Sequence, residues 1–381
     1  NQIAFIVEYT LRQNEIRSLT ALRALAAAMV FVFHYAQQPT HIIPEGLLRV
    51  IAQQGYVGVD LFFVLSGFIL TVRYFREMAD RQFSIGKYFQ RRAARIYPLY
   101  FTILALTLLL RHETPNITNL TLTQGFFLNY FGTGISTTWT LTVEECFYLI
   151  FPLMLLTIIP MRRPSQILLT LVAWTTAFFV LGFVLMTWTR QSGIYLQAGF
   201  LGRPGQFTLY PFAYTIFGYV FDFSIGIFIA IPYLKGIKWK LWQSTLLAVI
   251  GIGGILYCEN VIAVQQGDLS SDRLIVYVIA MFAGALILAL TCKEAPLSRL
   301  LSWKIFVYLG RISFALYLIQ NTALVDFMRG WDLVPFYIGA NVLCALLYQF
   351  VEEPGRKAVM NFKFRRIQQM KINNTQEIKT L

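Results

Sequence analysis

The sequence predicts an all-α polytopic membrane protein, and three properties support this. Of its 381 residues, 57% are hydrophobic and only 13% are charged, against about 25% charged in ordinary soluble domains. The mean hydropathy is +0.58. The apolar residues gather in runs of about 20, the length of a transmembrane helix. This composition excludes soluble globular, disordered, collagen-like and disulfide-rich proteins, because none of them buries so large an apolar fraction.

Ten apolar segments are predicted to span the membrane as helices. Backbone groups in lipid must hydrogen-bond internally, and nothing in the chain alternates like a barrel strand. The third segment is short, so we expect it to extend into the amphipathic stretch before it. Segment 120–131 is too short to span and is expected to dip into the interface. The predicted spans are 20–38, 56–72, 96–110, 139–160, 166–189, 211–233, 241–258, 273–291, 304–325 and 336–353.

The basic residues orient these spans. If the N-terminus is cytoplasmic, 25 of the 32 Lys and Arg residues fall inside, in segments 1–23, 71–95, 161–166, 234–240, 292–304 and 352–381. The outside loops hold Arg49, Arg111, Arg190, Arg203, Arg273 and Arg329. This follows the positive-inside rule and predicts that both termini are cytoplasmic. Residues 1–353 then form the membrane domain, and 354–381 form a basic cytoplasmic tail. The net charge of +13 is therefore a topology signal, and no nucleic acid partner is expected.

Cysteine and histidine are too sparse for a metal site. The chain has three histidines and four cysteines, and no two cysteines have CxxC spacing. We expect the cysteines to act as small packing residues in apolar runs and no metal to be bound. They are Cys146, Cys258, Cys292 and Cys344.

A few ionisable residues lie within the predicted spans, where they are costly and tend to be functional. A structural interpretation stays open for each. Arg23 and Arg311 lie near cytoplasmic ends and can snorkel to the headgroups. Asp60 and Asp222 can hold helices together by hydrogen bonds. The full set is Arg23, His34, Asp60, Glu144, Glu145, Asp222 and Arg311.

Spacing connects some of these residues. Arg23 and His34 are eleven positions apart, about three helical turns, so they share one face about 16 Å apart along the axis. Arg23 lies at the cytoplasmic end and His34 beyond mid-membrane. That face can connect a cytosolic ligand with a reactive centre in the outer half.

An arginine pair marks the cytoplasmic mouth of the third span. Arg92 and Arg95, in RRAARIYPLY, are neighbours on a helix. Guanidinium groups bind phosphates in bidentate fashion, so a nucleotide-bearing donor such as a coenzyme A thioester fits. The alternative is a positive-inside signal alone, to which we assign Arg91.

Two adjacent carboxylates begin the fourth span in TWTLTVEECFYLIFP. Glu144 and Tyr148 share a helix face, whereas Glu145 points about 100° away. His34 and Glu144 both fall in the outer half, so we expect Glu144 to orient His34 for acid–base chemistry on a hydroxyl.

At these residues the chain resembles the acyltransferase-3 family of integral membrane O-acyltransferases, in a form without a C-terminal SGNH domain. The motifs are RSLTALRALAAAMVFVFHY, GYVGVDLFFVLSGFIL, RRAARIYPLYF, TWTLTVEECFYLIFPL, LGRISFALYLIQ and VEEPGRK, in the family's order. The resemblance implies acyl-CoA, with acetyl-CoA foremost, as donor substrate and no permanently bound cofactor. It also implies a carbohydrate or lipid-linked sugar hydroxyl as acceptor, and a bacterial cytoplasmic (inner) membrane as location.

The resemblance also implies roles for single residues. His34 would be a general base or a transient acyl carrier. One position departs from the family, because the ninth-helix motif often ends in His and Gln320 stands there. Gln320 can bind substrate by hydrogen bonds, but proton transfer by it is in doubt. The implied catalytic residues are His34, Glu144 and Asp60, the donor-binding residues Arg23, Arg92 and Arg95, and the substrate-binding residues Trp139, Glu145, Tyr148 and Gln320.

Many relatives append an esterase domain, whereas this chain ends about thirty residues after its last predicted span. We therefore expect the acyl group to pass directly to an acceptor or to a separate protein. A transporter or flippase for an anionic or acylated substrate is the alternative function. Against it, 1–190 and 191–381 show no inverted repeat, and the buried charges concentrate in the first half.

Overall fold

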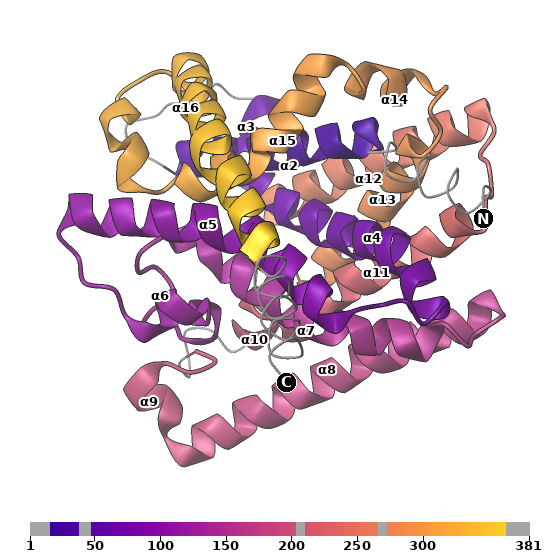
Figure 1. Cartoon of the computed structure of the whole chain (residues 1–381), viewed down its shortest axis with the longest axis horizontal. Coiled ribbons are helices and arrows are strands. Elements are labelled where there is room, and N and C mark those ends of the chain that lie inside the picture. Colours follow the sequence, from indigo (N-terminus) through magenta and orange to yellow (C-terminus); the bar gives the residue numbers. More distant parts are fainter. Residues whose placement is uncertain (1–15, 38–46, 203–209, 266–272, 363–381) are drawn as a thin grey trace, which may run out of the picture.

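A computed structural model describes residues 16–37, 47–202, 210–265 and 273–362, and within these ranges it is helical (Figure 1). The long helices follow the predicted order. Short 3-10 or α-helical turns connect several of them. The long helices are α2 (Arg17–Ala36), α4 (Gly58–Ala79), α5 (Ile85–Arg111), α7 (Trp139–Ile158), α8 (Pro164–Ser192), α11 (Ile216–Leu234), α12 (Leu241–Gln265), α13 (Arg273–Leu290), α15 (Lys304–Ile319) and α16 (Leu333–Leu347).

Nine helices in the described ranges are long and apolar enough to cross a membrane, which confirms the all-α polytopic class. The ninth predicted span, 304–325, is the one that is shorter than expected. Its helix, α15, ends at Ile319 after 16 residues, because a turn leads into the 3-10 helix η4 (Ala323–Met328). The extension of the third span is confirmed, since α5 begins at Ile85, after the N-cap Ser84.

Segment 120–131 forms no long helix, as predicted. It begins in the last two residues of the one-turn helix α6 (Ile117–Thr121) and contains the 3-10 turn η2 (Gln124–Phe126). Side chains hold it in place: the Tyr210 hydroxyl donates to the Gly125 carbonyl at 2.9 Å. This segment therefore lies against the start of α7 and does not span.

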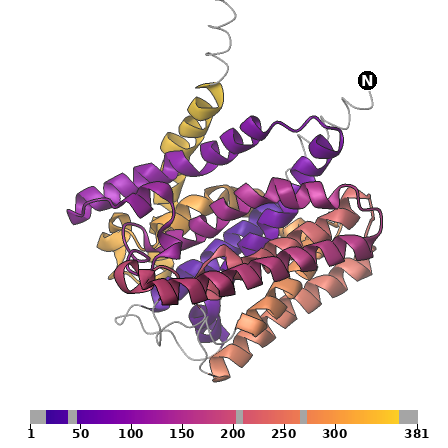
Figure 2. The same cartoon turned by 90° about the horizontal axis from the view of Figure 1, so that it is seen from below.

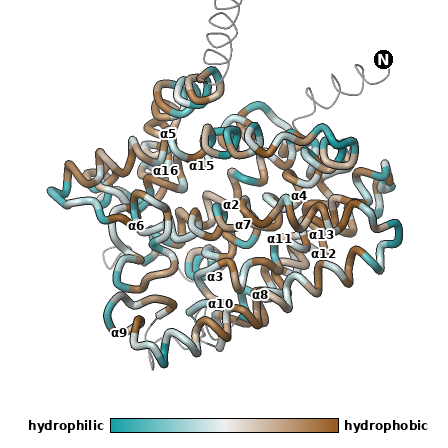
Figure 3. The backbone as a smooth tube through the Cα atoms, turned by 60° about the horizontal axis from the view of Figure 1, so that its bottom comes forward, coloured by the Kyte–Doolittle hydropathy of each residue, from teal (hydrophilic) through white to brown (hydrophobic). Residues whose placement is uncertain are grey.

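The helices differ in how much of their surface other helices cover. The α8 helix runs along one side of the molecule (Figure 1) with much of its apolar surface exposed, so it is suited to face lipid. The helices α11, α12 and α13 also consist mostly of hydrophobic residues, which are brown in Figure 3. The four cysteines are free, and all but Cys146 are buried, which confirms their prediction as packing residues.

Helix α4 packs closely against α11 because a glycine on each helix lies against the backbone of the other helix. A Cβ atom on Gly67 would lie 2.3 Å from the Phe223 carbonyl oxygen, and one on Gly226 would lie 2.1 Å from the Val64 carbonyl oxygen. Small residues allow membrane helices to approach in this way. The contact fixes the position of the middle of α4.

Gly67→Ala is expected to lower the free energy of unfolding by about 1–3 kcal/mol, because its methyl group collides with backbone that cannot rotate away. Gly253→Ala is the matched control, since a Cβ atom there meets nothing within 4 Å. Thermal unfolding in detergent measures both. Equal melting temperatures for the two variants would contradict the close contact.

The last helix continues beyond the predicted start of the tail at 354. After α16 the chain forms a π-helical turn, η5 (Tyr348–Glu352), and remains helical to residue 362. Gln90 on α5 donates to the Val359 carbonyl at 2.8 Å. The end of this helix thus packs beside α5, as Figure 2 shows.

Candidate functional site

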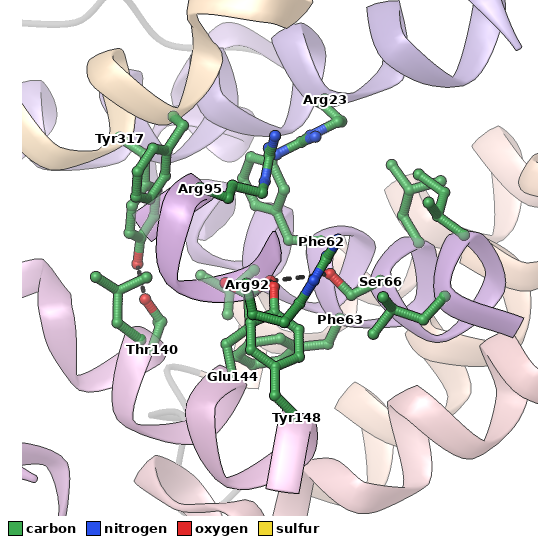
Figure 4. Close-up of a pocket in the computed structure, with 16 residues that line it drawn as sticks. Arg23, Phe62, Phe63, Ser66, Arg92, Arg95, Thr140, Glu144, Tyr148 and Tyr317 are labelled. Carbon is green, nitrogen blue, oxygen red and sulfur yellow. Dashed lines mark hydrogen bonds between the residues drawn. The ribbon is translucent and has the colours of Figure 1, made fainter. Parts of the chain in front are cut away.

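Five helices, α2, α4, α5, α7 and α15, surround a cavity of about 200 Å³ (Figure 4). Its polar lining combines residues predicted separately from three helices. Its apolar lining comes mainly from α4. The polar residues are Arg23, Ser66, Arg92, Arg95, Thr140, Glu144, Tyr148 and Tyr317, and the apolar ones include Phe62, Phe63, Leu70 and Phe314.

Three arginines give the cavity a strong positive charge. Arg92 lies over the Tyr148 ring, 5.4 Å from its centroid, and Arg95 lies 6.0 Å from the Phe314 ring. The buried Nε of Arg92 has no hydrogen-bond partner among the described residues. Aromatic faces support these guanidinium groups while their N–H groups stay available to an anion.

One carboxylate, Glu144, faces the arginines. Its Oε1 accepts a hydrogen bond from Ser66 Oγ at 3.2 Å and another from the Tyr148 hydroxyl. Glu145 does not line the cavity. It points to Tyr97 on α5, as its position 100° around the helix predicts.

His34 lies outside the cavity lining, next to Gln320 at the end of α15. Its Nδ1 lies 2.9 Å from the Val30 carbonyl oxygen. A carbonyl only accepts, so Nδ1 carries the proton and Nε2 keeps a lone pair. The predicted orientation of His34 by Glu144 is therefore wrong in this structure, because Glu144 is held by Ser66 and Tyr148 while Val30 and Gln320 hold His34.

Tyr317 forms part of the cavity wall. Its hydroxyl lies 2.7 Å from Thr140 Oγ1 and donates to the Thr137 carbonyl at 3.1 Å. Tyr317 and Gln320 are three residues apart on α15, or about one turn. The cavity wall at Tyr317 and the glutamine beside His34 thus lie on adjacent turns of α15.

Asp60 belongs to a second buried cluster, outside the cavity lining. Its carboxyl group lies beside that of Asp222 on α11, and Asp222 Oδ2 lies 3.8 Å from Arg273 Nη2. The Arg273 guanidinium stacks on Tyr219, 3.9 Å from the ring centroid. Arg273, expected in an outside loop, is the first residue of α13 and is only 6% exposed.

We expect Arg273→Gln to destabilise the protein by about 3–5 kcal/mol, because two carboxyl groups then remain buried without a cation. Arg190→Gln, at an exposed position near the end of α8, is the control. Detergent melting curves compare them. An unchanged melting temperature for Arg273→Gln would mean that the cluster is not held by this charge.

Trp139 is neither in the cavity lining nor next to His34. It packs among aromatic side chains, stacked on Phe131 at 6.0 Å and edge-on to Tyr214 at 5.3 Å between centroids. Of the residues predicted as a site, the structure brings Arg23, Arg92, Arg95, Glu144 and Tyr148 together. The others lie elsewhere: His34 with Gln320, Asp60 with Asp222, Glu145 with Tyr97, and Trp139 in its aromatic cluster.

Some residues of the site were not predicted as functional. Ser66, Thr140 and Tyr317 were visible only as parts of quoted motifs and were not singled out there. Glu352, on the π-helical turn, is buried near Arg95 and Arg23. Its position in the motif VEEPGRK was the sequence signal that could have identified it. Outside the site, Glu259 is fully buried in α12, one residue past the predicted end of that span.

Comparisons with known proteins agree with this architecture. The sequence profile of a family described as "Acyltransferase domain" matches residues 16–351. The chain is 26% identical over 378 residues to "O-acetyltransferase OatA" of Staphylococcus aureus (strain NCTC 8325 / PS 47), covering 89% of this chain and 57% of that protein.

Two further relatives extend the comparison. A protein of Staphylococcus aureus (strain COL), also named as an O-acetyltransferase, is 23% identical over 389 residues, which cover 91% of this chain and 58% of that protein. An uncharacterised Haemophilus influenzae protein is 31% identical over 143 residues, covering 32% of this chain and 58% of that protein. The chain thus spans little more than half the length of these relatives. No solved structure matches it significantly.

Proposed function

Because the chain belongs to the acyltransferase domain family, we propose that it is an integral membrane O-acyltransferase. It would move an acetyl or other short acyl group from cytosolic acyl-CoA to a hydroxyl of a carbohydrate or lipid-linked sugar, at the extracytoplasmic face. The observation that carries this proposal is the cavity, where three arginines meet one carboxylate inside the helix bundle. The names of the Staphylococcus aureus relatives favour acetyl as the acyl group.

The arginines suit the donor. Coenzyme A carries several phosphate charges, and Arg23, Arg92 and Arg95 supply guanidinium groups that bind phosphate oxygens in pairs. The apolar lining, including Phe62 and Phe314, suits the pantetheine arm and a short acyl chain. The donor would enter from the predicted cytoplasmic end, where the arginine pair of α5 lies.

His34 suits the acceptor. With Nδ1 bound to the Val30 carbonyl, Nε2 can remove the proton from an acceptor hydroxyl as a general base. Gln320, beside the ring, would hold the imidazole or the sugar by hydrogen bonds. Glu144 would act within the cavity, near the thioester. Asp60 would act from a distance, by holding α4 against α11 and α13.

The test is acetyl transfer by the purified chain in detergent, without a membrane gradient. Acetyl-CoA labelled in the acetyl group is added with an N-acetylglucosamine oligosaccharide as hydroxyl acceptor. Free coenzyme A and labelled ester or labelled acetate are expected. Binding of acetyl-CoA without release of the thiol would contradict the proposal and favour a transporter or flippase for an anionic or acylated substrate.

A further inference from the structure

We propose that Ser66 is the residue that first receives the acyl group, with Glu144 as its general base. This inference rests on the proposed function and adds a covalent step to it. Ser66 lines the cavity, and its hydroxyl donates to Glu144 Oε1 at 3.2 Å. A hydroxyl held on a carboxylate is the arrangement by which proteins activate a weak nucleophile.

The surroundings of Ser66 suit this step. Figure 4 shows Ser66 and Glu144 joined by a hydrogen bond, with Arg92 beside them. The backbone of α4 is fixed here, because neighbouring Gly67 packs on the Phe223 carbonyl. The nucleophile is thus held rigidly within the charged part of the cavity.

Tyr148 also donates to Glu144 Oε1, but it is less suited to carry an acyl group. Its side chain is 2% exposed, and its hydroxyl is in very close contact with the carboxylate. Arg92 covers its ring. Ser66 is only partly buried and meets the same oxygen at an ordinary distance. Tyr148 therefore fits a positioning role, in which it orients Glu144 toward Ser66.

The reaction balances in two halves. First, Ser66 Oγ bonds to the thioester carbonyl carbon and the carbon–sulfur bond breaks. The hydroxyl proton passes through Glu144 to the leaving sulfur, which departs as the thiol. Second, the acceptor hydroxyl oxygen attacks the Ser66 ester and the carbon–Oγ bond breaks. His34 takes up the acceptor proton and releases it through water to Glu144, which protonates the departing Ser66 Oγ.

This relay accounts for the separation of the two candidate bases. Glu144 faces the arginines inside the cavity, whereas His34 lies outside the cavity lining, beside Gln320. One residue can serve the donor half and the other the acceptor half.

The experiment is trapping of the acyl-enzyme. The purified 381-residue chain is incubated with labelled acetyl-CoA without acceptor, quenched in acid, and mapped by peptide mass spectrometry. We expect one acetyl group on Ser66, removable by hydroxylamine. Ser66→Ala should lose this label, and its release of coenzyme A should fall at least about a hundredfold. Ser66→Cys should carry the acetyl group as a thioester.

Thr71→Val is the matched control, because Thr71 lies on the same helix and its hydroxyl bonds only its own helix, at the Gly67 carbonyl 2.8 Å away. This variant should keep label and turnover. Melting curves establish that each variant is folded. If Ser66→Ala is unfolded, Ser66→Cys decides, since a wild-type-like fold without a thioester would overturn the relay.

The outcomes separate the two proposals. Label on Tyr148 or His34, or normal turnover by Ser66→Ala, would overturn the role of Ser66 while the acyltransferase assignment stands. Failure of the wild-type chain to release coenzyme A or bind a label would instead overturn the proposed function.

Discussion

His34→Ala is expected to reduce acetyl transfer to the oligosaccharide acceptor by about 10²–10⁴-fold, the usual contribution of one positioned general base. The physical reason is the lone pair on Nε2, which the Nδ1 contact with the Val30 carbonyl leaves available. The variant should have the melting temperature of the wild type, because the His34 side chain that it loses is only partly buried. Initial rates with labelled acetyl-CoA measure the effect.

The pattern of the loss is as informative as its size. If His34 serves the acceptor half alone, His34→Ala should still acquire the acetyl label on Ser66 but fail to discharge it. His112→Ala is the matched control, since His112 is exposed at the end of α5. Wild-type transfer rates in His34→Ala would exclude His34 as the base and leave Glu144 as the candidate.

Arg92→Ala is expected to raise the KM for acetyl-CoA by about tenfold to a hundredfold. A hydrogen bond to a charged group contributes about 1.5–3 kcal/mol, and each 1.4 kcal/mol changes affinity about tenfold. Arg92→Lys should recover only part of this, because lysine cannot form the bidentate contact with phosphate. Steady-state kinetics with varied acetyl-CoA separate KM from kcat.

Arg91→Ala is the control for that measurement. Arg91 is the next residue, but it does not line the cavity, and its Nη1 lies 3.6 Å from Glu77 Oε1 on the protein surface. Its loss should change KM little. If Arg91→Ala and Arg92→Ala weaken donor binding equally, the arginines attract the donor only through the general positive charge of that membrane face.

The sequence predicted the helices well because the lipid solvent imposes a simple rule on each segment. The apolar runs of about 20 residues are helical in the structure. The helix of the short third run begins upstream of that run, at Ile85. The predictions were weaker where helices end. The helix after Lys304 stops at Ile319, and the last helix continues to residue 362. A hydropathy pattern does not distinguish a buried turn, such as the one after Ile319, from a continuing apolar helix. It also does not show that a polar segment, such as the end of the last helix, stays helical because it packs on α5.

The candidate site was predictable where one helix or one motif defines it. Arg92 with Arg95, and Glu144 with Tyr148, line the cavity because helical periodicity places each pair on one face. Partners on different helices could not be predicted. Asp60 lies with Asp222 and Arg273 because α4, α11 and α13 meet there.

The sequence by itself therefore determined the membrane class, the helices and the charged residues that must be paired or functional. These follow from solvation, which acts on each segment separately. Only the tertiary structure decided which charged residues meet. It placed Ser66 against Glu144 and left His34 with Gln320, because helix packing depends on close contacts such as Gly67 on Phe223. Those contacts join residues whose distance in the sequence gives no sign of their proximity.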